Sequence, residues 1–507
     1  MEAFLERPFG TIPGLVRMHA ARAPRHAALI QDERSIDFAG LDAMMDRIAA
    51  AFQRDGLEAG RAIAICAANS IEYAAVFLGA LRAGLAVAPL APSSTPEAIA
   101  SMVADAGASH LFLDEAAAKA IAPALPRIAA RAIALEGLSR WIADATTPRA
   151  VEAAEDDPFN IIYSSGTTGV PKGIVQPNAM RWAHVVRGAV YGYGPGAITL
   201  VSTPLYSNTT LVSFFPTVAL GGTVVLMAKF DACAYLALAE RHRVTHTMLV
   251  PVQYQRIMAL ADFARYDLSS FRTKFSTSAP FAATLKADIV ARWPGGLYEY
   301  YGMTEGGGTC VLFAHESPAK LHTVGRPAPG VDLRLIDEEG REVSPGEVGE
   351  VVGHSAAMMT GYHRQPDMTS KAEWFDREGK RFIRTGDVGR FDEDGFLVLL
   401  DRKKDLVISG GFNVYPSDLE AVLARHGDVA DAAVVGVPSK KWGETPVAFV
   451  VARAGAAVDA EALREWANAR LGATQRIAAV ELIGSLPRNA IGKVLKRELR
   501  ELHRPRE

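Results

Sequence analysis

The chain has 507 residues, of which 49% are hydrophobic and 22% charged, and its 54 basic and 57 acidic side chains give a net charge of −3. That charge offers no general attraction to nucleic acid or to an anionic membrane, and the length suggests about three structural units. The three cysteines are widely spaced, which argues against a disulfide framework or a zinc site and favours a reducing compartment.

The N-terminal residues lack the basic-then-apolar order of a signal peptide. The longest apolar tract, 73–92, is interrupted by Arg82 and by glycines, so it does not resemble a membrane span. We therefore expect a cytoplasmic protein without a membrane-spanning segment.

The first half of the chain alternates helical and strand-like patterns. The expected elements are, in order, a helix over 41–52, a strand over 62–67, a helix over 71–83, strands over 85–90 and 198–203, a helix over 210–219, a strand over 222–227, a helix over 231–242 and a strand over 246–250. This alternation is typical of parallel sheets covered by helices.

A glycine- and hydroxyl-rich turn, Ser164–Gly173, follows an apolar strand-like run over 159–163. Glycines let the backbone approach a ligand closely, and exposed N–H groups, hydroxyls and Lys172 can surround an anion. The turn is not a Walker motif, because the lysine spacing differs and Gly173 stands where Ser or Thr would hold Mg²⁺. We interpret it as a polyphosphate-binding loop; the alternative is a flexible surface loop.

The second half changes texture from about Val331, where short strands alternate with Gly- and Asp-rich turns, which indicates an antiparallel or barrel-like piece. A run of five charged residues, Asp401–Asp405, follows and is interpreted as an exposed linker. The last hundred or so residues have a small α/β pattern: a helix over 417–426, strands over 432–437 and 447–451, and a helix over 460–471.

Four more segments have the composition of binding loops. Tyr301–Glu305 places an aromatic ring, a hydroxyl and a carboxylate on one turn, which suits a base, a phosphate and Mg²⁺. Thr385–Asp387 offers a carboxylate for ribose hydroxyls, Ser409–Asn413 has paired glycines, and Pro487–Lys493 carries one lysine on a glycine-containing loop. Each segment alone is commonly an ordinary turn, but their order on one chain is not expected by chance.

In this order and register the motifs closely resemble those of the adenylate-forming superfamily, which includes acyl-CoA synthetases, peptide-synthetase adenylation domains and luciferases. The resemblance runs from Asn69 to Lys493 and is closest to the acyl-CoA ligases. It implies an α/β fold: a large N-terminal domain (1–400) of mainly parallel, helix-covered sheets plus a β-barrel-like subdomain, a hinge (401–404), and a small, mobile α+β C-terminal domain (405–507).

The resemblance also implies a role for each motif residue. The residues that would bind ATP are Ser164, Ser165, Gly166, Thr167, Thr168, Gly169, Lys172, Ser278, Ala279, Pro280, Tyr301, Gly302, Met303, Asp387 and Arg402. The catalytic residues would be Thr304, which contacts the α-phosphate, Glu305, which ligates Mg²⁺, and Lys493. Lys404 would be the hinge pivot, and Gly410, Gly411 and Phe412 would line the passage for coenzyme A.

The acyl pocket departs from the family pattern. By position it would be lined by Tyr206, Ser207, Asn208, Thr209, Thr277, Gly307, Gly308 and Thr309. Ser207 and Asn178 stand where the family commonly has histidines, and Thr277 replaces a usual glycine. A polar pocket narrowed by Thr277 favours a small, hydroxylated or aromatic acid, or a short or medium chain, and the absence of arginine from these positions disfavours a dicarboxylate.

The sequence therefore predicts an ATP-dependent acid–CoA ligase, with ATP, Mg²⁺ and coenzyme A as cofactor and co-substrates and a small carboxylic acid as partner. The acid attacks the α-phosphate to form acyl-AMP and pyrophosphate, and the CoA thiol then yields the thioester. A carrier-protein thiol as acceptor is the alternative. A non-catalytic nucleotide-binding protein is disfavoured, and a homodimer is left open.

Overall fold

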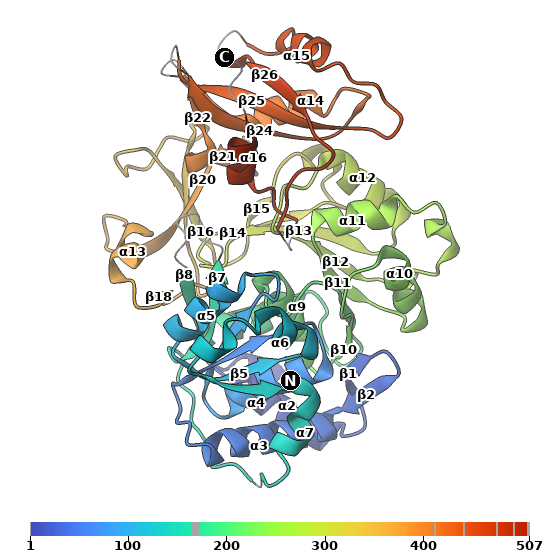
Figure 1. The fold of residues 1–507 in the computed structure, drawn as a ribbon, viewed down its shortest axis with the longest axis vertical. Helices are drawn as coiled ribbons and strands as arrows, with labels where there is room; N and C mark the ends of the chain where they lie inside the picture. The colour runs from blue at the N-terminus through green and yellow to red at the C-terminus, as the bar shows by residue number, and fades with distance from the viewer. Residues whose placement is uncertain are drawn as a thin grey trace. The chain divides into compact units, whose positions relative to one another are not determined.

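The protein is described by a computed structural model over residues 2–145, 147–164, 172–409, 412–439, 442–472, 475–489 and 492–503 (Figure 1). It divides into two compact units: unit 1 comprises Met1–Asp332 with Gly353–Ile383, and unit 2 comprises Leu333–Val352 with Arg384–Glu507. The predicted boundary near residue 400 stays a prediction. Within the described residues, no helix is both long and apolar enough to span a membrane.

The first sheet of unit 1 has seven strands in the order β18-β8-β7-β4-β3-β5-β6. The strands are β3 (Ala62–Cys66), β4 (Ala86–Leu90), β5 (Ala108–Leu113), β6 (Arg131–Ala134), β7 (Pro158–Ser164), β8 (Lys172–Pro177) and β18 (Gly361–Tyr362). The pairs among β3 to β7 are parallel, whereas β8 returns antiparallel to β7. Because helices cover this sheet, β3 and β4 are buried along their whole length.

The second sheet of unit 1 has nine strands in the order β15-β14-β13-β12-β11-β9-β10-β1-β2. The strands are β1 (Ala27–Gln31), β2 (Arg34–Asp37), β9 (Ile198–Val201), β10 (Thr223–Leu226), β11 (His246–Leu249), β12 (Thr273–Ser276), β13 (Gly296–Gly302), β14 (Thr309–Phe313) and β15 (Arg326–Pro327). The central strands are parallel, and the sheet edges β2, β14 and β15 are antiparallel.

Helices pack between and around these sheets. They are α1 (Glu2–Leu5), α2 (Ile12–Arg22), α3 (Phe38–Arg54), α4 (Ile71–Arg82), α5 (Pro96–Asp105), α6 (Glu115–Ile121), α7 (Leu138–Trp141), α8 (Asn178–Val190), α9 (Asn208–Ala219), α10 (Ala232–Arg241), α11 (Pro251–Met258), α12 (Ala283–Arg292) and α13 (Pro366–Lys371). Figure 1 shows α10, α11 and α12 beside the strands β11 to β13.

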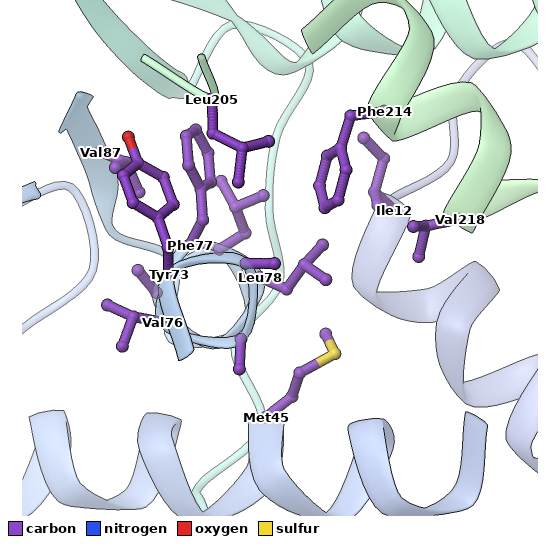
Figure 2. Packing of buried hydrophobic residues seen from close by; sticks show 14 of the residues in the cluster. Ile12, Met45, Tyr73, Val76, Phe77, Leu78, Val87, Leu205, Phe214 and Val218 are labelled. Carbon is purple, nitrogen blue, oxygen red and sulfur yellow. The ribbon is translucent and has the colours of Figure 1, made fainter. Parts of the chain in front are cut away.

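The main core of unit 1 is centred on α4. Figure 2 views this helix end-on, with Tyr73, Phe77 and Leu78 directed outward to different neighbours, including Met45 of α3 and Phe214 of α9. Because α4 is apolar on all sides, it can pack against helices from both sheets at once. One continuous core therefore joins the two sheets into a single scaffold.

The strands of unit 2 are mostly antiparallel. The elements of this unit are β16 (Asp332–Ile336), β17 (Gly349–His354), β20 (Arg381–Phe391), β21 (Leu397–Arg402), β22 (Val407–Ser409), β23 (Phe412–Val414), α14 (Pro416–Leu423), β24 (Val429–Ser439), β25 (Gly443–Ala452), α15 (Ala460–Asn468), β26 (Ala479–Leu482) and α16 (Lys496–Leu502). The strands β16, β17 and β20 cross the unit boundary, and β19 (Glu373–Phe375), which pairs with β20, lies in unit 1. One five-stranded sheet contains β16, β17 and β19 to β21, and a second contains β22 to β26.

The predicted α/β class is confirmed, and the expected helices and strands are present with shifts of a few residues at their ends. The cysteines Cys66, Cys233 and Cys310 are free, as expected. The interpretation of Asp401–Asp405 as an exposed linker is wrong in part. Asp401 and Arg402 belong to β21, opposite β20, and Asp401 accepts a hydrogen bond from the Ser417 N–H at 3.1 Å.

Candidate active site

The nine-stranded sheet of unit 1 has a topological switch point between β9 and β11. From β9 the chain continues to β10 on one side, whereas from β11 it continues to β12 and β13 on the other. In open parallel sheets, the crevice outside the carboxyl ends of the strands at such a point is the usual ligand site.

Predicted site residues from distant parts of the sequence follow these strands. Tyr206–Thr209 come after β9, Thr277–Pro280 come after β12, and Tyr301 and Gly302 end β13. Because β9, β11, β12 and β13 are parallel, their carboxyl ends lie at one edge of the sheet. The predicted acyl-pocket and adenine-binding residues therefore share one edge.

The turn after β13 is held by the segment 357–359. The Gly307 N–H donates to the Ala357 carbonyl at 2.8 Å, and the Met359 N–H donates to the Glu305 carbonyl at 2.8 Å. Gly306 has φ of 75°, and a Cβ built there would lie 2.0 Å from the Ala357 oxygen. Only glycine fits this close backbone approach, so the turn that carries Thr304 and Glu305 has a single defined shape.

Ser278 has a positive φ of 80°, which is unusual for a residue that is not glycine. Its hydroxyl lies 2.5 Å from the hydroxyl of Thr209, on the first turn of α9. Strained backbone of this kind persists where surrounding structure enforces it and is frequent at functional sites. The bond connects the predicted acyl-pocket segment to the predicted ATP-binding segment.

Glu305, the predicted Mg²⁺ ligand, accepts a hydrogen bond from the Tyr362 hydroxyl at 2.8 Å. Burial, and then the Glu305 charge, raise the pKa of Tyr362, so its hydroxyl stays protonated and donates. The Lys172 ammonium lies 5.9 Å from the centroid of the same ring. Tyr362 therefore links a predicted phosphate-binding cation to the predicted metal-binding carboxylate. No local sequence pattern indicates this contact.

The phosphate loop is described only at its ends. Ser164 closes β7 and pairs with Lys172, the first residue of β8. The predicted ligands Ser165, Gly166, Thr167, Thr168 and Gly169 lie outside the described residues, as do Gly410 and Gly411. For Ser164, Lys404 and Phe412, only the backbone is described: Lys404 lies in a 3-10 turn over Lys403–Asp405, and Phe412 starts β23.

An arginine that the sequence analysis missed lies beside the predicted acyl pocket. The Arg181 side chain is 1% exposed, and its Nη2 donates to the Asn208 Oδ1 at 2.9 Å. No arginine stands at the predicted pocket positions themselves, but Arg181 reaches one of them, Asn208, from the neighbouring helix α8. An arginine within the otherwise amphipathic pattern of α8 was the available signal.

In unit 2, Asp387 of β20 and Arg402 of β21 are directly opposite each other, and their side chains form an ion pair at 3.1 Å. The Thr385 hydroxyl accepts from the Asp387 N–H at 3.1 Å and donates to the Val351 carbonyl at 2.8 Å. These bonds set the direction in which the strand presents the Asp387 carboxylate. The two residues predicted to bind ribose are thus brought together.

Lys493 lies in a small hairpin of unit 2. Its backbone N–H donates to the Asn489 Oδ1 at 2.9 Å, and its carbonyl accepts from the Asn489 N–H at 2.9 Å. Arg488 donates to the Gly492 carbonyl at 2.6 Å and to Asp431 at 2.7 Å. Contacts outside the Lys493 side chain therefore define the shape of the loop that carries it.

A cavity of about 480 Å³ lies in unit 2 near the predicted CoA loop. Its wall includes the half-exposed indole of Trp442 and the side chains of Arg464, Asn468 and Arg476. The residue after Trp442 begins β25 and pairs with Ser409, which immediately precedes the predicted CoA glycines. Glu465 also lines the cavity, and Arg464 is paired with Glu461. An aromatic face beside two guanidinium groups suits a phosphorylated nucleoside.

Comparisons with known proteins find family models, relatives and solved structures that match most of the chain. The family model described as AMP-binding enzyme matches residues 16–363, and that of the AMP-binding enzyme C-terminal domain matches 418–493. The fatty acid–[acyl-carrier-protein] ligase ScoC of Streptomyces coeruleorubidus is 32% identical over 97% of this chain and 96% of its own length.

A second relative, the indoleacetate–CoA ligase of Aromatoleum aromaticum, is 32% identical over 96% of both chains. Among solved structures, ATP-bound MatB from Rhodopseudomonas palustris has a TM-score of 0.87 and 28% identity, over 97% of this chain and 99% of that one. The similarity therefore covers both the fold and nearly the full length.

Proposed function

The chain belongs to the family of AMP-binding enzymes and is an AMP-forming acid–thiol ligase. From this premise we propose that it joins a small aromatic or hydroxylated carboxylic acid to coenzyme A. The observation that carries the proposal is the edge of the nine-stranded sheet, where the acyl-pocket segments after β9 and β12 meet the turn Tyr301–Glu305 after β13. A site for an acid there adjoins a site for a nucleotide.

The first half-reaction forms a bond between an acid oxygen and the α-phosphorus of ATP, and pyrophosphate leaves. This step needs positioning and charge stabilisation rather than a protein nucleophile. Tyr301 would stack on adenine, Asp387 with Arg402 would bind the ribose, and Thr304 would contact the α-phosphate. Lys172 and Lys493 would stabilise the charge that develops on the phosphates and the carboxylate.

The donor set at Glu305 fits a magnesium ion. Mg²⁺ is usually bound by one or two carboxylates together with substrate phosphates and water, and Glu305 supplies one carboxylate already oriented by Tyr362. The bound ion would neutralise phosphate charge as pyrophosphate leaves. The chain's own contribution is to orient the Glu305 carboxylate through the hydrogen bond from Tyr362.

Replacing Tyr362 by phenylalanine tests this orientation. Residues that hydrogen-bond to a metal ligand typically contribute ten- to a hundredfold to metal affinity or activity. We expect Tyr362→Phe to raise the Mg²⁺ concentration needed for half-maximal pyrophosphate release by about tenfold. Tyr266→Phe, whose charged neighbours are Asp262, Arg265 and Glu240 rather than Glu305, is the matched control. An unchanged Mg²⁺ requirement in Tyr362→Phe would remove Tyr362 from this role.

In the second half-reaction, the CoA thiol loses its proton and its sulfur attacks the acyl carbon. A C–S bond forms, the C–O bond to the bridging oxygen breaks, and AMP leaves with that oxygen. The cavity at Trp442 favours CoA over a carrier protein, because an indole and two arginines can bind the adenine and phosphates of CoA. We expect Trp442→Ala to raise the KM for CoA about tenfold, since stacking on one base contributes about that much, while acid-dependent pyrophosphate release stays unchanged.

The control for this variant is Leu482→Ala, a half-exposed apolar residue of β26 in the same unit. If Trp442→Ala leaves the KM for CoA unaltered, the cavity does not bind the nucleotide end of CoA. Loss of pyrophosphate release as well would place Trp442 in the first half-reaction instead.

The decisive experiment is a screen for acid-dependent pyrophosphate release with ATP and Mg²⁺, over short-chain, medium-chain, benzoate-type and cinnamate-type acids. Thioester formation is then measured with CoA and no carrier protein. Pyrophosphate release without CoA consumption would favour the second candidate, a ligase for a carrier-protein thiol, which the similarity to ScoC supports. Absence of release with every acid would contradict both candidates.

A further inference from the structure

Three buried polar side chains and one partly buried asparagine form a cluster behind the predicted acyl pocket. This Arg181 cluster consists of Asn160 on β7, Gln176 on β8, Arg181 on α8 and Asn208 at the start of α9. Asn160 and Gln176 are fully buried, and Arg181 is 1% exposed. Within the described residues, no carboxylate pairs with the guanidinium, and its Nη1 has no hydrogen-bond partner.

The guanidinium determines how the three amides are oriented. It can only donate hydrogen bonds, so each amide must turn its oxygen toward it. Arg181 donates from Nε and Nη2 to the Asn160 Oδ1 at 3.2 and 3.1 Å, and from Nη2 to the Asn208 Oδ1 at 2.9 Å and to the Gln176 Oε1. Burial lowers the pKa of Arg181 to about 9, so the group stays cationic near neutral pH.

With the oxygens turned inward, the amide nitrogens must donate elsewhere. The Asn160 Nδ2 donates to the Gln176 Oε1 at 3.0 Å, and the Gln176 Nε2 donates to the Thr304 carbonyl at 2.6 Å. In the described parts of the chain, the Asn208 side chain forms hydrogen bonds only through its Oδ1, and its Nδ2 has no acceptor. Both N–H groups of the Asn208 amide are therefore left for a ligand, whereas its oxygen is occupied by Arg181 and Gln176.

The outer side of the cluster is the candidate active site. Thr304 belongs to the predicted nucleotide turn, and Asn208 is followed by Thr209, whose hydroxyl contacts Ser278. Asn208 is only partly buried, in contrast to the residues behind it. Arg181 therefore bonds directly to Asn208 of the predicted acyl pocket, and it is connected to the Thr304 carbonyl through Gln176.

We propose that Arg181 is a positioning residue that locks the Asn208 amide with its N–H facing the bound acid, so that the enzyme selects acids carrying a hydrogen-bond acceptor at that depth. This proposal rests on the proposed function. A site that leaves a buried donor without an acceptor loses about ten- to a hundredfold in affinity. Acids with a ring ether, carbonyl or hydroxyl oxygen at this point therefore outcompete hydrocarbon analogues of the same shape.

The test uses pairs of aromatic acids that differ only in a methoxy or an ethyl group at the same ring position. These groups are nearly isosteric, but only methoxy accepts a hydrogen bond. For the wild type at saturating ATP, we expect kcat/KM for pyrophosphate release to favour the methoxy acid about tenfold or more at one ring position. If every pair gave a ratio near one, the proposal would be overturned.

Variants then assign the preference to the two residues. Asn208→Leu and Arg181→Met should each bring the methoxy-to-ethyl ratio close to one, mainly through KM. The double variant should lower the ratio no further, because the two residues act as one unit. Arg181→Lys, which keeps a buried cationic donor, should retain part of the preference. Arg187→Met, on the same helix but outside the cluster, is the control and should keep the wild-type ratio.

The outcomes separate this proposal from the proposed function. If none of the acids tested supported pyrophosphate release, the proposed function itself would be contradicted. Release with unaltered selectivity in Asn208→Leu would overturn the role of Asn208 while leaving the function standing. Because Asn208 lies at the edge of the cluster, this variant decides the question even if Arg181→Met does not fold.

Discussion

Replacing Lys493 by alanine is expected to slow acid-dependent pyrophosphate release by about 10²–10³-fold, the usual loss when one electrostatic contact to a developing charge is removed. In the proposed reaction, the ammonium bridges the acid carboxylate and the α-phosphate, two anions that repel each other as they meet. Thioester formation from a supplied acyl-adenylate should stay within a few-fold of wild type, because no new phosphoryl bond forms in that step.

The hairpin around Lys493 makes this variant easy to interpret. Asn489 bonds the Lys493 backbone on both sides, and Arg488 closes the loop through the Gly492 carbonyl. Alanine keeps all of these contacts, so the loss can be attributed to the side chain. Arg497→Ala, an exposed position on the following helix, is the control. Unimpaired pyrophosphate release in Lys493→Ala would show that another group supplies the charge.

The helices and strands that the sequence predicts best are those in which the spacing and number of consecutive apolar residues already distinguish a helix from a strand. The helix expected over 71–83 is observed as α4, because twelve residues without a turn signal are too many for a strand. The strand expected over 246–250 is observed as β11. In both cases the periodicity and length of the apolar run specify the element without knowledge of its partners.

Long-range pairing explains what the sequence could not show. Asp401 was expected in an exposed linker because its neighbours are charged, but β21 pairs with β20 and turns Asp401 toward Ser417. Arg181 belongs to a helix that was not predicted, and its partners lie on three different elements, β7, β8 and α9, so no local pattern shows that they meet. The positive φ of Ser278 likewise has no local sequence signal.

A buried ion pair underlies the turn that carries the candidate active-site residues. Lys286 of α12 and Glu299 of β13 are 1% and 5% exposed, and their side chains are 2.5 Å apart. Lys286 also donates to the Thr323 carbonyl at 3.2 Å. Burial raises the pKa of Glu299 to about 7, although the Lys286 charge opposes the rise. Glu299 precedes Tyr301 by two residues, so the pair fixes the strand that ends at the site.

Replacing Lys286 by methionine is expected to lower the free energy of unfolding by about 3–5 kcal/mol at pH 8, because it leaves a buried carboxylate without a partner. The loss should shrink as the pH falls toward 5. Without Lys286, the Glu299 pKa in the folded protein rises further above its unfolded value, so stability decreases as pH increases between the two values. Urea unfolding across this pH range measures the effect.

The double variant Lys286→Met with Glu299→Met should recover most of the lost stability, since a buried ion pair replaced by apolar side chains is often neutral. Lys119→Met, at an exposed position on α6, should change the stability by less than about 0.5 kcal/mol. A loss in Lys286→Met that does not vary with pH would mean that the removed contacts to Thr323 and Phe281, rather than the unpaired Glu299 carboxylate, account for it. The pH slope therefore separates lost packing from an unpaired charge.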